Sequence, residues 1–211
     1  MNKKERAAQI VSRLEKVYPN AACALEYGGE PWKLLVMGIL SAQCTDKRVN
    51  IVCRGLFERF PDINSMADAS PEDIEELIRS CGLYKTKAKN INACCKMLIE
   101  RYGAEVPHTM EELLSLPGVG RKIANLILGD IYKIPSVVTD THCIRLAGRM
   151  GLCKKGEKNP VKVEKELVLL IAPDKQVDFC HRLVMFGREY CSSRSPRCSE
   201  CPIAELCKKA F

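Results

Sequence analysis

The chain lacks a long apolar segment. Its longest apolar run, residues 34–40, is far shorter than the roughly 20 residues that cross a bilayer. The lysine-rich start leads into an amphipathic pattern without the apolar core of a signal peptide. The alternation of apolar and polar residues that marks a strand is missing almost everywhere. These absences exclude membrane-spanning and secreted proteins and predict a cytoplasmic, all-α protein with no membrane partner.

The residues that are present suit a globular helical fold. Hydrophobic residues make up 46% and charged residues 28% of 211, which is typical of a soluble protein with a full core. Apolar residues recur at helical spacing in ten stretches. We therefore predict helices over residues 4–17, 31–42, 47–60, 71–81, 86–102, 110–116, 121–132, 141–150, 160–171 and 175–190.

The net charge of +7 is unevenly distributed along the chain. Residues 62–80 carry one arginine against six acids, a net −5. Residues 83–103 carry a net +4, and residues 140–168 a net +3. A charge run is often only a solvated face, but segregation on this scale also favours a basic face that binds a polyanion.

The most informative stretch is Leu-Pro-Gly-Val-Gly-Arg-Lys at residues 116–122. Pro117 ends one helix, and Gly118 and Gly120 permit a tight turn in conformations closed to other residues. The next helix then presents its amides and positive dipole end, which suits a phosphate. An ordinary interhelical turn explains the glycines equally well. Lys122 in the first helical turn opposes the dipole, which favours the neutral amine that a nucleophile requires.

Thirteen cysteines in a cytoplasmic chain are unlikely to form disulfides. Four are crowded near the C-terminus as C-x6-C-x2-C-x5-C, a spacing that indicates a metal or cluster and leaves zinc open: Cys191, Cys198, Cys201 and Cys207. The other nine are scattered, and we predict that they are small buried apolar residues: Cys23, Cys44, Cys53, Cys81, Cys94, Cys95, Cys143, Cys153 and Cys180.

The hairpin sequence is followed, eighteen residues after Lys122, by Asp140 within Val-Thr-Asp-Thr-His. Together with the cysteine spacing, this constellation resembles the endonuclease III branch of the helix–hairpin–helix DNA glycosylases over essentially the whole chain. The resemblance implies that Lys122 is the nucleophile, that Asp140 is its catalytic partner, and that the four clustered cysteines hold one [4Fe–4S] cluster. By itself, Asp140 is more simply the N-cap of the helix over residues 141–150.

The same resemblance assigns roles in DNA binding. Gln43 matches the residue that fills the gap left by an extruded nucleotide, and Leu83 matches an apolar wedge between bases. From composition alone, they are a helix-end amide and a loop leucine on the core. Cys44 stands where the family more often has alanine, which we expect to affect packing only. The other candidate DNA contacts are Gly118, Gly120, Arg121, His142, Arg194 and Arg197.

The implied function is base-excision repair by a bifunctional DNA glycosylase and abasic-site lyase. We expect a monomer, associated with the nucleoid, that acts on double-stranded DNA with oxidised pyrimidines or abasic sites. Mismatch-specific adenine glycosylases lack the hairpin lysine and carry a further C-terminal domain, whereas this chain has Lys122 and ends four residues after Cys207. A DNA-binding module without catalysis and an electron-transfer protein are the alternatives of a different class.

The architecture implied by the family is two helical lobes with a DNA-binding cleft. Residues 24–134 are expected to form a six-helix bundle that includes the hairpin. Residues 1–23 and 135–211 are expected to form a discontinuous iron–sulfur domain. Lys122 and Asp140 would then face each other across the cleft.

Overall fold

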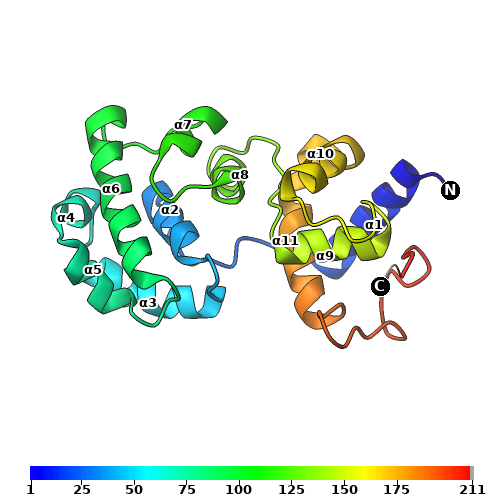
Figure 1. The fold of residues 1–211 in the computed structure, drawn as a ribbon. Helices are drawn as coiled ribbons and strands as arrows, with labels where there is room; N and C mark the ends of the chain where they lie inside the picture. The colour runs from blue at the N-terminus through cyan, green and yellow to red at the C-terminus, as the bar shows by residue number, and fades with distance from the viewer. Residues whose placement is uncertain (210–211) are drawn as a thin grey trace. The chain divides into compact units, whose positions relative to one another are not determined.

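The computed structural model describes residues 1–209 and shows an all-α fold (Figure 1). The described residues form eleven α-helices and one 3-10 turn, with no strand among them. The α-helices are α1 (Lys3–Val17), α2 (Pro31–Leu40), α3 (Asp46–Arg59), α4 (Ile63–Asp68), α5 (Pro71–Ile78), α6 (Tyr84–Tyr102), α7 (Met110–Ser115), α8 (Arg121–Asp130), α9 (Thr141–Met150), α10 (Pro160–Leu170) and α11 (Gln176–Glu189). The predicted fold class is confirmed, and each of the ten predicted helices is present. None of the helices in residues 1–209 is both long enough and apolar enough to span a membrane.

The helix that sequence patterning missed is α4. At six residues it is shorter than two turns, so its apolar residues Ile63, Met66 and Ala67 complete only a single i, i+3, i+4 set. Its start nevertheless carries a local signal. The Asp62 carboxylate accepts from the Ser65 amide at 2.8 Å, and the Ser65 hydroxyl accepts from the Asp62 amide at 3.2 Å. With α4, the segment predicted to hold six helices holds seven.

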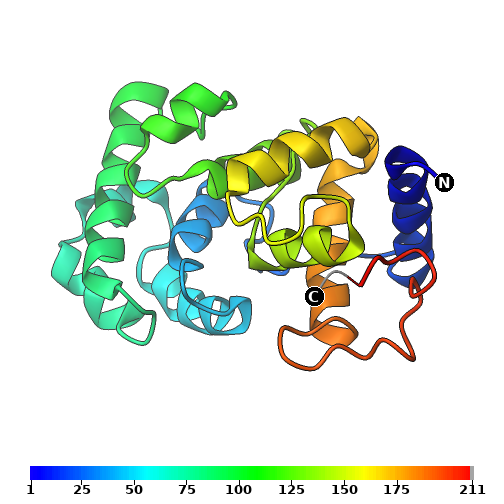
Figure 2. The ribbon, with the colours of Figure 1, turned by 45° about the vertical axis from the view of Figure 1, so that its right-hand side comes forward.

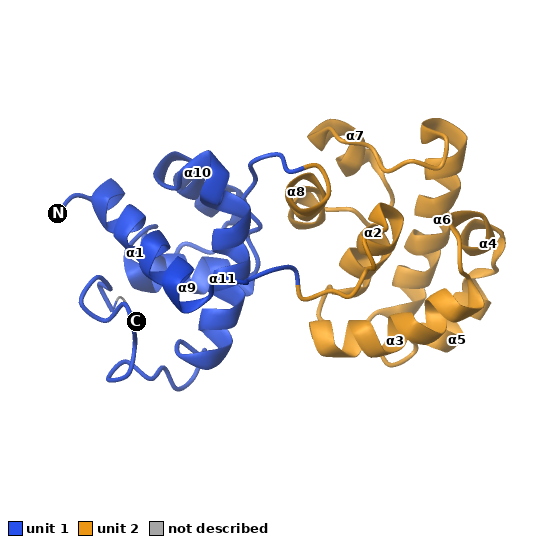
Figure 3. Cartoon of the chain, turned by 180° about the vertical axis from the view of Figure 1, so that it is seen from behind, with its two compact units in different colours: residues 1–23, 133–211 blue, residues 24–132 orange. Residues whose placement is uncertain are grey.

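The chain divides into two compact units (Figure 3). One unit is residues 24–132, and the other joins residues 1–23 to residues 133–211. The second division falls after residue 132, whereas residue 134 was predicted as the last of the bundle.

Helix α2 is central to the unit of residues 24–132. Eight of its ten residues are buried, as expected for a helix that is apolar nearly all round. It packs against α3, α6 and α8. The approach to α8 is close, since a Cβ added at Gly38 would lie 2.9 Å from Cγ2 of Ile123. This packing brings the start of α8 next to the last turns of α2.

In the other unit, α1 packs on α10 and α11, and both ribbon views show α1 beside α11 (Figures 1 and 2). The apolar face of α1, which includes Ile10 and Leu14, is fully buried. Polar contacts add to this packing. Tyr18 donates its hydroxyl to Glu189 at 2.7 Å, and the buried Arg182 donates to the Tyr18 carbonyl at 3.2 Å. These long-range contacts explain why residues 1–23 belong with the C-terminal part of the chain.

Seven of the nine scattered cysteines are buried, as predicted. Cys23 and Cys44 are only half-buried, so for these two the prediction of a buried core position is wrong. Burial raises the pKa of Cys53 and that of Cys95 to about 12. These two thiols are therefore neutral core side chains rather than reactive groups.

Candidate active site and nucleic-acid interface

The hairpin between α7 and α8 depends on one glycine. Leu116 and Val119 bury their side chains and anchor the turn. Gly118 has φ +78°, and a Cβ there would lie 2.8 Å from Cβ of Asn90. Gly120 has φ −98° and open space around its Cα, so the prediction that its conformation is closed to other residues is wrong. Gly120 is instead the N-cap of α8 and places no side chain over the first amides of that helix.

Lys122 is the second residue of α8 and is half-buried. Its Nζ donates a hydrogen bond to the Ser41 hydroxyl at 3.3 Å. Ser41 Oγ in turn donates to the Gly38 carbonyl at 2.7 Å, so a lone pair of the hydroxyl faces the amine. The partner of this amine is thus a neutral hydroxyl rather than a carboxylate. Ser41 was not predicted, because it is 81 residues away in the sequence.

Asp140 is the N-cap of α9, as predicted. Its Oδ1 accepts from the Cys143 amide at 2.7 Å. The four residues before it are buried, and the Val138 amide donates to Cys180 Sγ at 3.3 Å. This anchoring fixes a half-buried carboxylate at the start of a helix. Lys122 lies in one compact unit and Asp140 in the other.

Gln43 and Leu83 are both in the left-handed backbone region, with φ 53° and 59°. Non-glycine residues rarely adopt this conformation, and it persists only where the surrounding contacts impose it. Gln43 lies in the loop of residues 41–45, which we name the Gln43 loop, and Leu83 ends residues 79–83, the Leu83 loop. Leu83 is 60% exposed, so the alternative of a leucine tucked onto the core is wrong. Both side chains are presented outward by strained backbone, a feature of functional sites.

Lys87 is a functional candidate that sequence patterning missed. It counted toward the basic face of residues 83–103, yet it is buried, with only 4% exposed. Its Nζ donates to the carbonyls of Leu40 at 2.9 Å and Ala42 at 2.6 Å. The sequence did carry a signal of this burial: Lys87 lies four residues before Ile91, on the apolar face of α6.

The cysteines of the C-terminal loop surround one cavity. Cys191, Cys198, Cys201 and Cys207 all line it. In residues 1–209 no three His, Cys, Asp or Glu side chains converge tightly enough for one ion, whereas thiols spread around a cavity suit a larger metal group. Burial raises the pKa of Cys207, and the neighbouring thiols add to the shift. Bound cationic iron is what stabilises such crowded thiolates.

Helix α9 supplies two arginines that bind the loop at Cys191, and one of them, Arg149, lines the cavity. Arg149 Nη1 donates to Cys191 Sγ at 3.3 Å and to the Ser192 carbonyl at 2.7 Å. Arg145 donates to the Cys191 carbonyl at 3.1 Å. Hydrogen bonds to ligand sulfur orient the ligands and tune a cluster. These arginines were not predicted, because α9 and the loop are about forty residues apart in the sequence.

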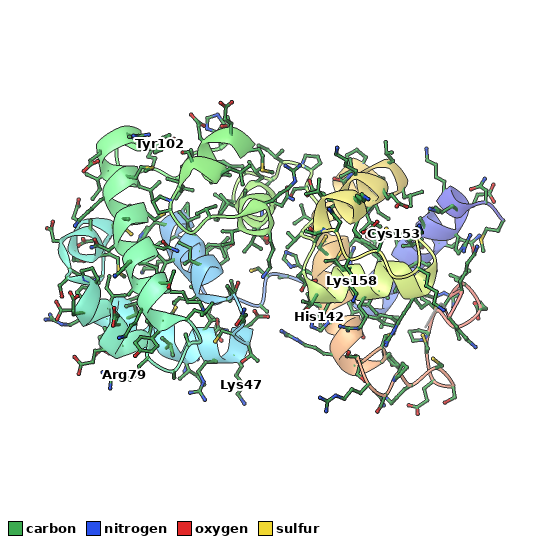
Figure 4. All side chains as sticks on the ribbon, in the orientation of Figure 1. Lys47, Arg79, Tyr102, His142, Cys153 and Lys158 are labelled. Carbon is green, nitrogen blue, oxygen red and sulfur yellow. The ribbon has the colours of Figure 1, made fainter. Side chains whose placement is uncertain are left out.

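Three predicted DNA contacts lie in the unit of residues 1–23 and 133–211, and their surroundings differ: Arg194, Arg197 and His142. Arg194 is exposed. Arg197 donates to the Glu189 carbonyl through Nε at 3.1 Å and Nη2 at 2.6 Å, and its guanidinium lies 5.2 Å from the Tyr190 ring centroid. Arg197 therefore also holds the loop against α11. His142 lies at the start of α9, half-buried, with Nδ1 at 3.2 Å from Arg145 (Figure 4).

Comparisons with known proteins agree with this arrangement. Residues 36–173 match the family model described as HhH-GPD superfamily base excision DNA repair protein. Residues 191–207 match the iron–sulfur binding domain of endonuclease III. Endonuclease III of Synechocystis sp. is 46% identical over 210 residues, covering 99% of this chain and 94% of that protein. Endonuclease III of Escherichia coli K12 is 36% identical over 208 residues, covering 99% and 97%.

Solved structures give the same result. A trapped endonuclease III–DNA covalent intermediate matches with a TM-score of 0.93 at 38% identity, covering 100% of this chain and 98% of that one. A thermostable thymine-DNA glycosylase, with a TM-score of 0.87, is only 20% identical and shares the fold. The chain carries one [4Fe–4S] cluster in its C-terminal loop. With the hairpin, the cysteine loop and near-full-length matches in agreement, the chain belongs to the endonuclease III family of base-excision repair enzymes.

Proposed function

We propose that this DNA glycosylase and abasic-site lyase removes oxidised pyrimidines from double-stranded DNA, with Lys122 as nucleophile. The observation that carries the proposal is the placement of Lys122. It stands in the first turn of α8, directly after the hairpin, and its amine is held by the neutral Ser41 hydroxyl at 3.3 Å. The backbone amides of the hairpin suffice to bind a phosphate, so the amine is free to serve as the nucleophile.

The proposed reaction begins with the neutral amine of Lys122. Nζ attacks C1′ of the sugar, the bond from C1′ to the base breaks, and the base leaves with the electron pair. Loss of an amine proton and opening of the sugar ring give a Schiff base between Nζ and C1′. Removal of a C2′ proton then expels the 3′ phosphate by β-elimination, and water releases Lys122.

Asp140 is proposed as the carboxylate that stabilises positive charge on the sugar as the base departs. A fixed carboxylate is effective there because it needs no reorganisation during the step. Its cap on α9 and the buried segment before it supply that fixation. Capping occupies Oδ1 and is compatible with this second role.

Binding of DNA is proposed to combine backbone contacts with insertion of side chains. Gly118, Gly120 and Arg121 at the start of α8 would hold one phosphate. Gln43 would fill the space of the extruded nucleotide and Leu83 would enter the stack as a wedge. In the other unit, His142, Arg194 and Arg197 are the proposed contacts.

The four loop cysteines are proposed as the ligands of the [4Fe–4S] cluster, which when bound cross-links the loop and fixes its conformation. The residues fit the group, because the four thiols line one cavity and Arg149 donates to Cys191 Sγ. The apolar Phe186 and Ile203 line the same cavity and limit access of water. We also propose that the protein acts as a monomer on nucleoid DNA in the cytoplasm.

The test is incubation of the purified protein with a duplex that contains one thymine glycol. We expect base release with strand scission, and a covalent protein–DNA adduct after reduction with borohydride. A duplex with adenine opposite a mismatched base is the comparison substrate. Release of adenine without scission would contradict the proposal, and binding without any base release would indicate a DNA-binding module.

A further inference from the structure

The Gln43 and Leu83 loops are joined by one buried charge. Lys87 lies in the first turn of α6, directly after the Leu83 loop, and only 4% of it is exposed. Its ammonium donates to the Leu40 carbonyl at 2.9 Å and to the Ala42 carbonyl at 2.6 Å. Leu40 is the last residue of α2, and Ala42 immediately precedes Gln43.

The placement of a cation at this point has a physical reason. The last carbonyls of α2 have no partner within the helix, and they form the negative end of its dipole. An ammonium satisfies both features at once. Burial lowers the pKa of Lys87, which shows that keeping a charge here carries a cost. An apolar residue would pack on the same face of α6 without that cost, so packing alone does not account for a lysine.

The backbone of Lys87 contacts the second loop. Its amide donates to the Leu83 carbonyl at 3.0 Å and begins the hydrogen-bonding of α6. Lys87 therefore contacts both loops. Its amide donates to the Leu83 carbonyl, and its ammonium donates to the carbonyl of Ala42, the residue before Gln43. Both inserted residues have positive φ, which the surroundings must impose.

The two loops also touch each other next to Lys87. A Cβ added at Gly82 would lie 3.7 Å from the Gln43 carbonyl, so their backbones are nearly in contact. The Cys81 thiol, beside Gly82, lies close enough to the Cys44 thiol, beside Gln43, to raise the pKa of Cys81. All of these contacts lie within the unit of residues 24–132.

We infer that Lys87 is a positioning residue, whose buried ammonium holds the Gln43 and Leu83 loops in the one arrangement that lets both side chains enter the duplex together. The inference rests on the proposed function. Lys87 touches neither substrate nor Lys122 in this role. Lys87 acts on extrusion of the nucleotide, before any covalent bond breaks. Extrusion requires Gln43 to fill the gap left by the nucleotide while Leu83 enters the base stack.

The test compares two substrates in single-turnover measurements. Lys87→Met keeps an unbranched side chain, one atom shorter, and removes its donors. We expect it to slow release of a paired thymine glycol about tenfold or more, as loss of a charged hydrogen bond does. Scission at a preformed abasic site, where no base has to be extruded, should change by less than about threefold. Lys87→Arg, which keeps charge and donors, should recover part of the loss.

Lys89→Met is the matched control. Lys89 is exposed on the same helix, so this variant removes one positive charge without touching the loops. It should weaken binding by about one phosphate contact at most and leave the ratio of the two rates unchanged. Equal slowing of Lys87→Met on both substrates would overturn the inference and leave Lys87 with a structural role only.

A double-variant cycle with Leu83→Ala completes the design. If Lys87 acts through the inserted residues, Lys87→Met should add little to the slowing already caused by Leu83→Ala. Fully additive effects would contradict the inference. If Lys87→Met does not fold, the same rate measurements are made with Lys87→Gln, which retains one donor group. Failure of wild type on thymine glycol would overturn the proposed function instead.

Discussion

At the scale of single residues, Lys122 owes its position to two helices. Helix α8 places it in the first turn, and the close approach of α8 to α2 at Gly38 brings its amine to Ser41. The nearest partner is neutral, so the amine can act as a nucleophile without first breaking an ion pair.

Replacing Lys122 by alanine should therefore separate chemistry from binding. We expect Lys122→Ala to abolish strand scission and borohydride trapping, while the affinity for damaged DNA changes by less than about tenfold, because one contact contributes little. Borohydride trapping on an abasic-site duplex measures the loss of chemistry, and a binding titration measures the affinity for damaged DNA. Trapping at the wild-type level would place the nucleophile elsewhere in the chain.

Asp140 carries two proposed roles that one substitution can separate. Asp140→Asn keeps an oxygen for the cap on α9, so the free energy of unfolding should fall by only about 0.5 kcal/mol. If the carboxylate stabilises the sugar cation, base removal should slow by about a hundredfold or more. Scission at a preformed abasic site should slow less. Single-turnover rates on both substrates and a denaturant titration test this, and unchanged base removal would leave Asp140 only a cap.

At the scale of elements, the hairpin offers a matched pair of glycines. Gly118 has positive φ and Asn90 close by, whereas Gly120 has ordinary φ and open space. Gly118→Ala should destabilise the unit of residues 24–132 by about 2 kcal/mol or more, from backbone strain and the clash with Asn90. Gly120→Ala should cost less, about 0.5 to 1 kcal/mol, which is the difference between glycine and alanine at an N-cap.

The single tryptophan, Trp32 in α2, reports on this unit, so its fluorescence in a urea titration measures both variants. The two should also differ in scission of a preformed abasic site, because only Gly118→Ala distorts the turn before Lys122. Equal destabilisation by the two substitutions would contradict the role assigned to Gly118.

At the scale of the whole molecule, the two compact units should respond separately to loss of the cluster. Cys198→Ser should lose the brown colour of the protein and expose residues 191–207 to proteolysis, since the cluster cross-links this loop. Urea unfolding followed by Trp32 should change little, because Trp32 lies in the other unit. Cys44→Ala, outside the loop, should keep its colour. Full colour in Cys198→Ser would remove Cys198 from the ligand set.

Alkaline pH should destabilise the unit of residues 24–132 through its buried thiols. Burial raises the pKa of Cys53 and that of Cys95 from 9.0 to about 12. The folded form keeps these protons more tightly, so their contribution is complete below pH 9 and is lost as the pH rises toward 12. Over that range each thiol lowers the free energy of unfolding by about 1.4 kcal/mol per pH unit.

The variant with Cys53→Ala and Cys95→Ala should show a flatter dependence, by about 3 kcal/mol per pH unit for the two thiols together. Urea titrations followed by Trp32 fluorescence at pH 9 to 11, under reducing conditions, measure both slopes. Titration of lysines and tyrosines is common to the two proteins. Parallel slopes would show that these thiols ionise as easily in the folded protein as in the unfolded chain.

The sequence by itself determined the features that depend on neighbouring residues. Helical periodicity predicted ten helices, and Asp140 was recognisable as a cap three residues before the amide it accepts from. The hairpin and the spacing of the four cysteines were equally readable, and with them the family and its cluster. Each of these signals lies within a few turns of chain, where local geometry is nearly independent of the rest of the fold.

Only the tertiary structure decided which polar groups meet across long separations. The sequence alone suggested that Lys87 is a surface charge. In the structure it is buried, because the face of α6 that carries Lys87 packs against the end of α2. The tertiary structure also brings Lys122 to the Ser41 hydroxyl and Arg149 to Cys191 Sγ. The physical reason is that burial and pairing of a charge depend on the packing of helices far apart in sequence, which no local pattern encodes.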